Sequence, residues 1–397
     1  MRVGIIEICE QSHYLAASVI AKIYASDEDN KVYFYLDSNI FNKNNPKDLP
    51  KNVELVIKPL DQDWEVFIQG VNSLALDVLH INTVSKYFHK ISSIPFKAKK
   101  ISFSVHNVED FFDNDIIKRT KKWWFSIKKA VLDQHFKIIY INTVLFIKSF
   151  WRQYYKDKFI TNLIRKNYFL VVYSQGQANY LANFVDKKNI IVLPMAIYEP
   201  HKEILINEKK TFRITIPGVV SSDKRDYLGL LLALERNLAI KEKFTWDFLG
   251  FIAENETETL EKMKSLIAHN VDIQYYPNFI SEEEFNIKAK QADIILGNLK
   301  TELNPFQKYG QTKESTTIFH MIKYAKIGFL PKDYQTDDHF KSSYITFYDY
   351  DDLIKSLVIL SEDKHRLKIL NSKALELSEK FTAKTVFERD LKPFILE

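Results

Sequence analysis

The sequence predicts an α/β protein made of two doubly wound, Rossmann-like domains in series. Three observations lead to this fold class. The chain has 397 residues, more than a single hydrophobic core usually supports. Short apolar runs rich in Val, Ile, Phe and Tyr alternate with amphipathic segments, which is typical of a parallel sheet covered on both faces. The alternation breaks once, at a polar stretch near the middle of the chain, and then restarts.

The first domain is predicted at residues 1–197. Its expected strands are, in chain order, RVGIIEI, KVYFYL, NVELVI, DVLHIN, KISFSV, YFLVVYS and NIIVLP. The segments between them predict helices, for example HYLAASVIAKIYA at 13–25, where apolar residues recur at helical spacing. Because ligands of such sheets bind beyond the carboxyl ends of the strands, we expect site residues directly after strands.

The second domain is predicted at residues 211–380. It follows a polar stretch rich in Lys and Glu, YEPHKEILINEKK at 198–210, which is interpreted as the linker between the domains. Its expected strands are FRITIPG, TWDFLG, VDIQYY, ADIILGN, IGFLP and YITFY. The last segment, 381–397, is expected to form a C-terminal helix that packs back on the first domain.

Composition excludes several classes of protein. With 46% hydrophobic and 27% charged residues the chain can build packed interiors, so disorder is not expected. The single cysteine, Cys9, rules out an internal disulfide framework and favours a reducing compartment. Glu7 and Glu10 interrupt the apolar start where a signal peptide needs an unbroken core, and the apolar run 138–147 is about half of a membrane span. We therefore expect a cytoplasmic protein.

The stretch TIPGVVSSDKRDYLGLLLAL at 215–234 is the first candidate for chemistry. An apolar strand ends at a proline and Gly218, a short polar loop carries the adjacent cations Lys224 and Arg225, and an apolar helix follows. A helix N-terminus with unpaired backbone N–H groups and two cations beside it complements a diphosphate. The alternative is a surface helix capped by the Ser-Ser-Asp of the loop, with two solvated cations.

This stretch resembles the opening of the second domain in glycosyltransferases of the GT-B fold, in particular the large retaining, family-four-like group of bacterial polysaccharide enzymes. There, a strand, Gly-Arg, a short loop, a Lys and a Leu-rich helix follow one another. Lys224 matches the donor-phosphate lysine, whereas the family's arginine is Val219 here, so Arg225 is taken as its replacement. WDFLGF at 246–251 resembles the strand that closes around the nucleotide base, which makes Gly250 a donor-side residue. The resemblance implies two domains that face each other across a cleft.

The segment YGQTKESTTIFHMIKYAKIGFLP at 309–331 occupies the place of the family's donor-binding signature. In the family, two glutamates eight positions apart hold the donor sugar and the ribose. The matching positions are Thr312 and His320, so the signature is degenerate. Three residues at a predicted helix start still offer backbone amides to phosphate or sugar hydroxyls: Lys313, Glu314 and Ser315. The alternative is a capping segment with Ser315 at the cap.

The first domain supplies the acceptor side in this architecture. KISFSV is followed by His106 and Asn107, which resemble the family's strand and the histidine that lines the cleft near the transferred sugar. A neutral histidine ring there donates or accepts a hydrogen bond, and the alternative is a histidine that only stabilises its loop. Glu109 is a candidate general base, although charged loop residues are usually only solvated. Glu10 and His13, in the loop after the first strand, are weaker acceptor-side candidates because the family's glycines are missing there.

Other motifs of site chemistry are absent from the sequence. There is no G-x-G-x-x-G, no Walker A loop, no Cys/His metal spacing and no G-x-S-x-G. The Asp-x-Asp of PLDQDW at 59–64 resembles the cation site of metal-dependent glycosyltransferases of the other fold, but this triplet is frequent by chance. We expect no metal and no bound cofactor, and the nucleotide diphosphate sugar is a donor substrate.

The basic, aromatic segment 117–168 carries 13 Lys and Arg against Asp133 and Asp157, a net charge of +11, whereas the whole chain is +5. Cations attract anionic headgroups and Trp and Tyr prefer the membrane interface, so peripheral contact with an anionic membrane is expected. A helical hairpin with core aromatics and solvated lysines explains the same pattern. Interleaved aromatics and cations also describe nucleic-acid grooves, but no nucleic-acid module is recognisable, and we expect no nucleic-acid partner.

The resemblance implies a glycosyltransferase that moves a sugar from a nucleotide diphosphate sugar to a glycan or lipid-linked acceptor in bacterial surface polysaccharide synthesis, independently of a metal. Lys224 and Arg225 are expected to stabilise the charge that grows on the leaving diphosphate, and His106 to position the transferred sugar or the acceptor. A sugar-nucleotide epimerase of the same fold and a noncatalytic glycan- or membrane-binding partner remain alternatives. The retaining or inverting outcome stays open.

Overall fold

The structure is a computed structural model that describes residues 1–46, 48–83, 86–92, 95–111, 116–132, 136–164, 168–200, 211–337 and 340–396. The chain packs into two compact units. Unit 1 comprises Met1–Tyr173, Ala178–Leu193 and Phe387–Glu397, and unit 2 comprises Ser174–Gln177 and Pro194–Val386. Most of the predicted linker 198–210, residues 201–210, lies outside the described residues.

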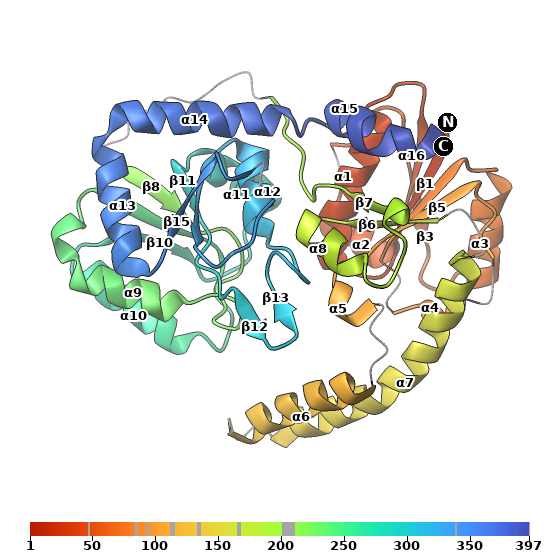
Figure 1. Ribbon diagram of the computed structural model, residues 1–397, viewed down its shortest axis with the longest axis horizontal. Helices are drawn as coiled ribbons and strands as arrows, with labels where there is room; N and C mark the ends of the chain where they lie inside the picture. The colour runs from red at the N-terminus through yellow and green to blue at the C-terminus, as the bar shows by residue number, and fades with distance from the viewer. Residues whose placement is uncertain are drawn as a thin grey trace. The chain divides into compact units, whose positions relative to one another are not determined.

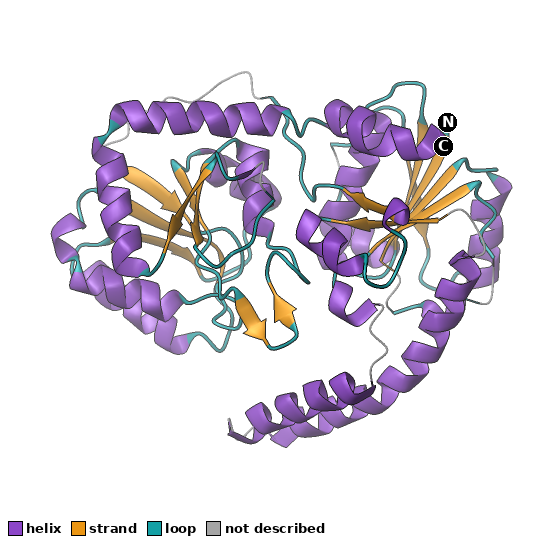
Figure 2. Cartoon of the chain, in the orientation of Figure 1, coloured by secondary structure: helices purple, strands orange, loops and turns teal. Residues whose placement is uncertain are grey.

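Unit 1 is built on a sheet of seven strands among its described residues, all parallel and in the order β3-β2-β1-β4-β5-β6-β7. Figure 2 draws strands in orange and helices in purple. The strands are β1 Arg2–Glu7, β2 Lys31–Asp37, β3 Val53–Lys58, β4 Val78–Thr83, β5 Lys100–Ser104, β6 Tyr168–Val172 and β7 Ile190–Val192. All six residues of β4 are buried, as expected for a central parallel strand covered on both faces. Even its polar residues His80, Asn82 and Thr83 are buried.

The helices of unit 1 connect these strands (Figure 1). They are α1 Tyr14–Ala25, α2 Ser38–Asn44, α3 Trp64–Ser73, α4 Phe88–Ile91, α5 Val108–Phe111, α6 Ile116–Leu132, α7 Phe136–Ile164 and α8 Gln175–Leu181, of which residues 178–181 belong to unit 1. Short 3-10 turns lie at Gln11–His13 and Lys187–Asn189. Connections through helices are what parallel neighbours require.

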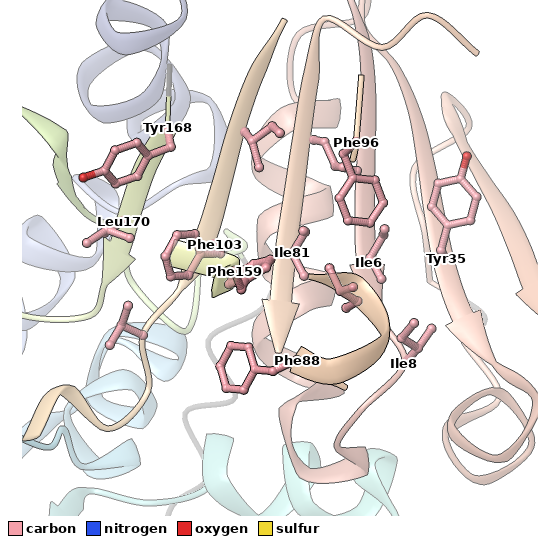
Figure 3. Close-up of a cluster of buried hydrophobic side chains, with 14 of the residues drawn as sticks. Ile6, Ile8, Tyr35, Ile81, Phe88, Phe96, Phe103, Phe159, Tyr168 and Leu170 are labelled. Atoms are coloured by element: carbon pink, nitrogen blue, oxygen red, sulfur yellow. The ribbon is translucent and has the colours of Figure 1, made fainter. Parts of the chain in front are cut away.

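One aromatic cluster ties α4 and α7 to the sheet of unit 1. Figure 3 shows Phe88, Phe103 and Phe159 among its buried side chains. The ring of Phe159 lies 5.5 Å from that of Phe88 and 5.7 Å from that of Phe103, centroid to centroid. The C-terminal part of α7 is thus anchored in the core.

Unit 2 contains a sheet of six strands in its described residues, also parallel, in the order β10-β9-β8-β11-β14-β15, and a separate hairpin of β12 and β13. The strands are β8 Phe212–Thr215, β9 Phe244–Phe251, β10 Asp272–Tyr276, β11 Ile294–Leu296, β12 Glu302–Asn304, β13 Gln307–Lys308, β14 Ile327–Pro331 and β15 Tyr344–Phe347. The helices are α9 Tyr227–Arg236, α10 Thr257–Ala268, α11 Glu282–Lys290, α12 Thr316–Tyr324, α13 Tyr350–Glu362, α14 Lys364–Glu379 and α15 Ala383–Val386, with a 3-10 turn at Leu238–Ile240.

The end of the chain returns to unit 1. A π-helical turn, Phe387–Leu391, leads into α16 Lys392–Leu396. The ring of Phe387 contacts that of Tyr24, and the ring of Phe394 contacts that of Phe169. Lys100 donates a hydrogen bond to the carbonyl of Phe394 at 2.6 Å. The preceding residue Phe381 still packs within unit 2, against Phe340.

In each sheet the direction of winding reverses at one point. In unit 1 this point lies between β1 and β4, and in unit 2 between β8 and β11. At such a reversal the connecting helices leave on opposite faces, and the carboxyl ends of the two strands are free to receive a ligand. The residues that follow these four strands are therefore the first place to examine for a site.

Candidate functional site

In unit 2 the loop after β8 is held rigidly. Gly218 has φ +106, a conformation that favours glycine, and its N–H donates to the carbonyl of Leu249 at 2.9 Å. Ser222 donates through both its backbone N–H and its hydroxyl to the carboxylate of Glu256, each at 2.6 Å. Lys300 donates to the carbonyl of Ser222 at 2.6 Å. The loop that carries Lys224 and Arg225 thus has a fixed path.

The side chain of Arg225 lies under this loop and is only 7% exposed. Its Nη1 donates to the hydroxyl of Tyr227 at 3.3 Å, and a side chain added at Gly218 would begin 3.1 Å from its Nη2. Within the described ranges, no carboxylate pairs with this guanidinium, although it has five N–H donors. A buried charge without a partner is costly, so the arrangement is suited to receive an anion.

Lys224, its neighbour, is exposed. Its backbone is pinned, since its carbonyl accepts from the N–H of Lys300 at 3.1 Å, while its ammonium makes no hydrogen bond to another described residue. The two predicted cations therefore differ: Arg225 is buried and fixed, and Lys224 is a solvated charge beside it.

A buried amide lies at the other strand of the reversal point. Asn298 follows β11 and is 0% exposed, and its carbonyl accepts from the N–H of Asp226 at 3.1 Å. Neither its Oδ1 nor its Nδ2 has a hydrogen-bond partner in the part of the chain that the structure describes. Buried amide atoms are nearly always paired, so this side chain is a candidate ligand contact that the sequence reasoning missed. The sequence did contain a signal for Asn298, because it is a polar residue two positions after the run ADIIL.

The two helix starts of unit 2 that the sequence nominated as ligand sites, those of α9 and α12, are capped by side chains. Asp226 caps α9 and accepts from the N–H of Gly229 at 3.0 Å, so a carboxylate already occupies the helix start where the sequence suggested phosphate. Ser315 caps α12 and accepts from the N–H of Thr317 at 3.2 Å, which is the alternative described for it above. Side chains, rather than helix amides, are left to hold an anion near α9.

The residues in the place of the two family glutamates make structural contacts. The hydroxyl of Thr312 is buried and accepts from the N–H of Lys308 at 3.1 Å, which closes the turn after the β12–β13 hairpin. The ring of His320 packs between Phe285, at 5.2 Å, and Tyr324, at 6.0 Å. Burial, together with the nearby charges of Lys323 and Arg225, lowers the pKa of His320 to about 3, so the ring is neutral.

Glu314 lies beside this turn. Its carboxylate accepts from the N–H of Ser315 at 2.8 Å and from the hydroxyl of Tyr334. Burial raises the pKa of Glu314 to about 7, although these hydrogen bonds oppose the rise. Lys313 contributes through its backbone, its N–H donating to the carbonyl of Lys308 at 3.3 Å.

Gly250 holds the Gly218 loop in place by its small size. A side chain added to Gly250 would begin 2.2 Å from the carbonyl oxygen of Gly218, closer than any real contact. This glycine therefore permits β9 and the loop to approach each other, and it acts on the site through the backbone.

In unit 1 the reversal point is occupied by a buried carboxylate. Glu7, 0% exposed, ends β1 and accepts from the N–H groups of Cys9 at 2.9 Å and Glu10 at 3.0 Å. Its second oxygen accepts from the amide of Asn82 at 2.6 Å and from the hydroxyl of Thr83 at 2.7 Å, both from the end of β4. Burial raises the pKa of Glu7, whereas all four hydrogen bonds lower it.

Thr83 links this carboxylate to His13. The hydroxyl of Thr83 has one proton and gives it to Glu7, so its oxygen accepts from Nδ1–H of His13, 2.9 Å away. The lone pair of the imidazole is then on Nε2, an assignment that follows from the hydrogen-bond pattern. A base oriented by a second group, which is oriented by a carboxylate, is a recurrent arrangement for moving protons.

His106 stacks on His13, with ring centroids 3.8 Å apart. Its Nε2 donates to the carbonyl of Asn82 at 3.1 Å and lies 3.3 Å from the hydroxyl of Tyr173. Burial holds the pKa of His106 well below its usual value, and His13 lowers it further. His13 and His106 are thus brought together with four residues that the sequence reasoning did not assign to the site: Glu7, Asn82, Thr83 and Tyr173.

The other acceptor-side candidates lie around this group. Glu10 forms an ion pair with Lys86 at 3.0 Å. Asn107 is exposed, whereas Glu109, on α5, is buried. No group of three or more His, Cys, Asp or Glu residues that could hold a metal ion occurs among the described residues.

No family model matches the sequence, and no curated protein matches it. Solved structures match over nearly the whole chain at low identity. A glycosyltransferase from Rickettsia africae has a TM-score of 0.63 and 13% identity, covering 100% of this chain and 98% of its own. HepE of Anabaena in complex with UDP and glucose has a TM-score of 0.58 and 12% identity, covering 98% of each chain. A trehalose-6-phosphate protein from E. coli bound with UDP-2-fluoro glucose has a TM-score of 0.55 and 11% identity, covering 98% of this chain and 97% of its own. The predicted fold, two Rossmann-like domains of the GT-B type, is confirmed.

Proposed function

We propose that this protein is a glycosyltransferase that takes a sugar from a nucleotide diphosphate sugar and transfers it to a glycan or lipid-linked acceptor. The observation that carries the proposal is Arg225, a buried guanidinium at the reversal point of unit 2 that pairs with no carboxylate of the described residues. A diphosphate supplies the anion that this side chain lacks, and a guanidinium fits two phosphate oxygens at once. HepE, which shares the fold, was solved with UDP and with UDP-glucose, and this supports a donor of the same class.

In the proposed reaction, Arg225 and Lys224 stabilise the negative charge that grows on the leaving diphosphate as the glycosidic bond breaks. The buried arginine contributes most, because its position is fixed before reaction and little water screens it. Asn298 is buried, and its side-chain amide has no hydrogen-bond partner among the residues that the structure describes, so it is placed to contact the donor from the end of β11. This charge stabilisation does not require a metal ion.

In unit 1, we assign binding of the acceptor to His13 and His106. Nε2 of His13 carries a lone pair and can accept a proton or a hydrogen bond from an acceptor hydroxyl. His106, held neutral by burial, orients the first ring and the bound sugar. Glu7 and Thr83 fix the tautomer of His13 and are positioning residues.

We further propose that the protein is a divergent relative of the retaining, family-four-like polysaccharide enzymes, with a role in surface polysaccharide synthesis on the cytoplasmic side of the membrane. The matching positions Lys224 and His106 support this. A noncatalytic, ligand-binding partner is the second candidate, since Thr312 and His320 stand where the family has glutamates and both make structural contacts.

The test uses purified protein and a panel of UDP, GDP, CMP and dTDP sugars. We expect release of one nucleoside diphosphate, slow alone and faster with acceptor. Binding of that nucleotide, measured by calorimetry, should weaken at least tenfold in Arg225→Met and stay unchanged in Arg236→Met, an exposed arginine of α9 paired with Asp351. An epimerised donor sugar as product would show that the protein is a sugar-nucleotide epimerase. Nucleotide binding without turnover would show that it is a noncatalytic binding partner. No binding of any nucleotide would refute the proposal.

A further inference from the structure

Helices α6 and α7 form an arm on unit 1. They lie side by side and extend away from the sheet (Figure 1). Inside the arm, the ring of Trp123 stacks on that of Phe146, with centroids 5.1 Å apart and planes 25° apart, and Phe146 contacts Phe150. At its root, buried Phe159 is held in the core of unit 1 by Phe88 and Phe103 (Figure 3). The arm is therefore a packed helical hairpin with an anchored base.

The outer face of α6 alternates apolar and cationic side chains. Ile117, Lys121, Trp124, Lys128 and Val131 follow one another at spacings of four and three residues, so they form one stripe along the helix. All five are exposed, Trp124 to 62%. The predicted hairpin alternative explains the packed aromatics but not this exposed stripe.

The outer face of α7 has the same character. Tyr140, Ile147, Trp151 and Tyr154 are spaced by seven, four and three residues and form a second exposed stripe, with Trp151 exposed to 68%. Further exposed side chains beside this stripe are Ile141, Leu145, Lys148 and Arg152. Clusters of exposed apolar side chains of this extent mark interaction surfaces on soluble domains.

Charge identifies the partner. The sequence of α6 has six Lys and Arg and no acid, and that of α7 has five with one acid, Asp157. Such a surface repels a second copy of itself, which argues against dimerisation through the arm. Nucleic acid offers phosphates and base faces but no environment that rewards burial of Ile141, Leu145 and Ile147. An anionic bilayer satisfies all three kinds of side chain, because headgroups attract the cations, the interface takes Trp and Tyr, and the acyl boundary takes the aliphatics.

The arm is suited to lie on a bilayer. Among the described residues, no helix is both long enough and apolar enough to span a membrane. In α7, Lys148 directly follows Ile147 and Arg152 directly follows Trp151, so each cation lies beside the apolar stripe, and its long side chain can reach headgroup level when the helix lies flat.

We propose that the outer face of the α6–α7 arm docks on bilayers that carry anionic headgroups, with Trp124 and Trp151 at the interface. This inference rests on the proposed function for its purpose, since an enzyme that extends a lipid-linked acceptor must reach the membrane surface. Membrane contact itself depends on the arm alone and is measured without donor or turnover.

The experiment measures partition of the full-length protein onto vesicles by flotation. Vesicles of phosphatidylcholine alone are compared with vesicles that also contain phosphatidylglycerol, at low and high salt. We expect retention only on the anionic vesicles, weakened by salt, with a blue shift of tryptophan fluorescence. The double variant Lys121→Ala/Lys128→Ala should partition about 25-fold less, since each lysine near such a surface contributes about 5-fold. Trp124→Ser/Trp151→Ser should lose the fluorescence shift and most retention.

Matched controls lie on unit 2. Phe279→Ser removes an aromatic side chain that is 77% exposed, and Lys264→Ala removes an exposed lysine of α10; both should partition as the wild type does. Melting temperatures of all variants report whether they fold. Equal retention on neutral and anionic vesicles, or arm variants that bind like the wild type, would overturn the proposal. Two other results would also overturn it: a dimer in sedimentation that the arm variants abolish, or binding to a single-stranded oligonucleotide that is tighter than binding to vesicles and that the arm variants abolish. Arg225→Met should leave vesicle binding unchanged, which separates docking from the donor site.

Discussion

The imidazole rings of His13 and His106 lie parallel, with centroids 3.8 Å apart and planes 11° apart. Two charged rings at this distance repel each other, so at most one of them takes up a second proton and becomes an imidazolium. Burial keeps His106 neutral, and its Nε2 is committed to the carbonyl of Asn82. His13 is linked through Thr83 to the carboxylate of Glu7 and is therefore the ring that can accept a proton.

Replacement of Thr83 by valine should break this link with little change in shape. We expect the free energy of unfolding to fall by about 1–3 kcal/mol, because Glu7 and His13 each lose a buried hydrogen-bond partner. Nitrogen chemical shifts of the His13 ring should show that Nδ1 no longer holds the proton predominantly, and transfer activity should fall at least tenfold.

Thr215 offers a matched control for that variant. It is a buried threonine at the end of β8, and its hydroxyl has no hydrogen-bond partner among the described residues. Thr215→Val should be neutral or stabilising, since an unpaired buried hydroxyl is replaced by a methyl group. Equal destabilisation by the two substitutions, measured by urea denaturation, would contradict the role given to Thr83.

Gly250→Ala should disturb the donor loop without touching a ligand. The added methyl group would collide with the carbonyl of Gly218, so we expect destabilisation of about 1–3 kcal/mol and weaker nucleotide binding as the loop shifts. The control is Gly70→Ala in α3, where nothing lies within 4 Å of an added methyl group. That variant should gain about 0.5–1 kcal/mol from helix propensity and bind nucleotide as before. A stable Gly250→Ala protein with full affinity would show that the close approach is dispensable.

Glu314 should make stability depend on pH. Its folded-state pKa is about 7, above the ordinary value of 4.5, so between these values the folded protein binds a proton that the unfolded chain has lost. The contribution of Glu314 to stability is therefore present below pH 4.5 and is lost as the pH rises through 7. Glu314→Gln keeps an acceptor for Tyr334 and removes the titration. The melting temperature of Glu314→Gln minus that of the wild type should be larger at pH 8 than at pH 5, and a constant difference would mean that Glu314 is ionised throughout.

The fold was predictable because its central strands are buried on both faces. Runs such as VGII at 3–6 and IIL at 294–296 are apolar without interruption, and a parallel sheet covered on both faces is the arrangement that requires this. The β12–β13 hairpin was not predicted, since Glu302–Asn304 and Gln307–Lys308 are too short and polar to show a period. Residues 381–397 were expected to form one helix, whereas the described chain has a π-helical turn at Phe387–Leu391 between α15 and α16.

The site was only partly predictable, for a physical reason. His106 lies two residues after β5, and Arg225 lies in the short loop between β8 and α9, so local sequence was enough to nominate them. Glu7 attracted attention only as a charge that interrupts an apolar start, because the groups that make it a site residue, Asn82 and Thr83, lie 75 and 76 residues further along the chain. No local pattern contains such a pairing. His320 was nominated from its register alone, and its packing against Phe285 depends on α11, which the register does not include.

Two arginines of unit 2, the partly buried Arg213 and the buried Arg225, allow the role of Arg225 as an anion receptor to be tested by stability alone. Arg213 is paired with the buried carboxylate of Asp247 at 3.3 Å and also donates to Gln274 at 3.0 Å. Arg225 has no carboxylate partner among the described residues. Arg213→Met should therefore cost about 3–5 kcal/mol, because it leaves Asp247 buried without a counter-charge. Arg225→Met should leave the ligand-free protein at least as stable as the wild type, since it removes a buried cation that has no carboxylate partner among the described residues. The defect of Arg225→Met should appear only in the presence of nucleotide. Nucleotide should raise the melting temperature of the wild type and of Arg236→Met, but not that of Arg225→Met. A ligand-free Arg225→Met protein destabilised as much as Arg213→Met would mean that the guanidinium is a structural support and not an anion receptor.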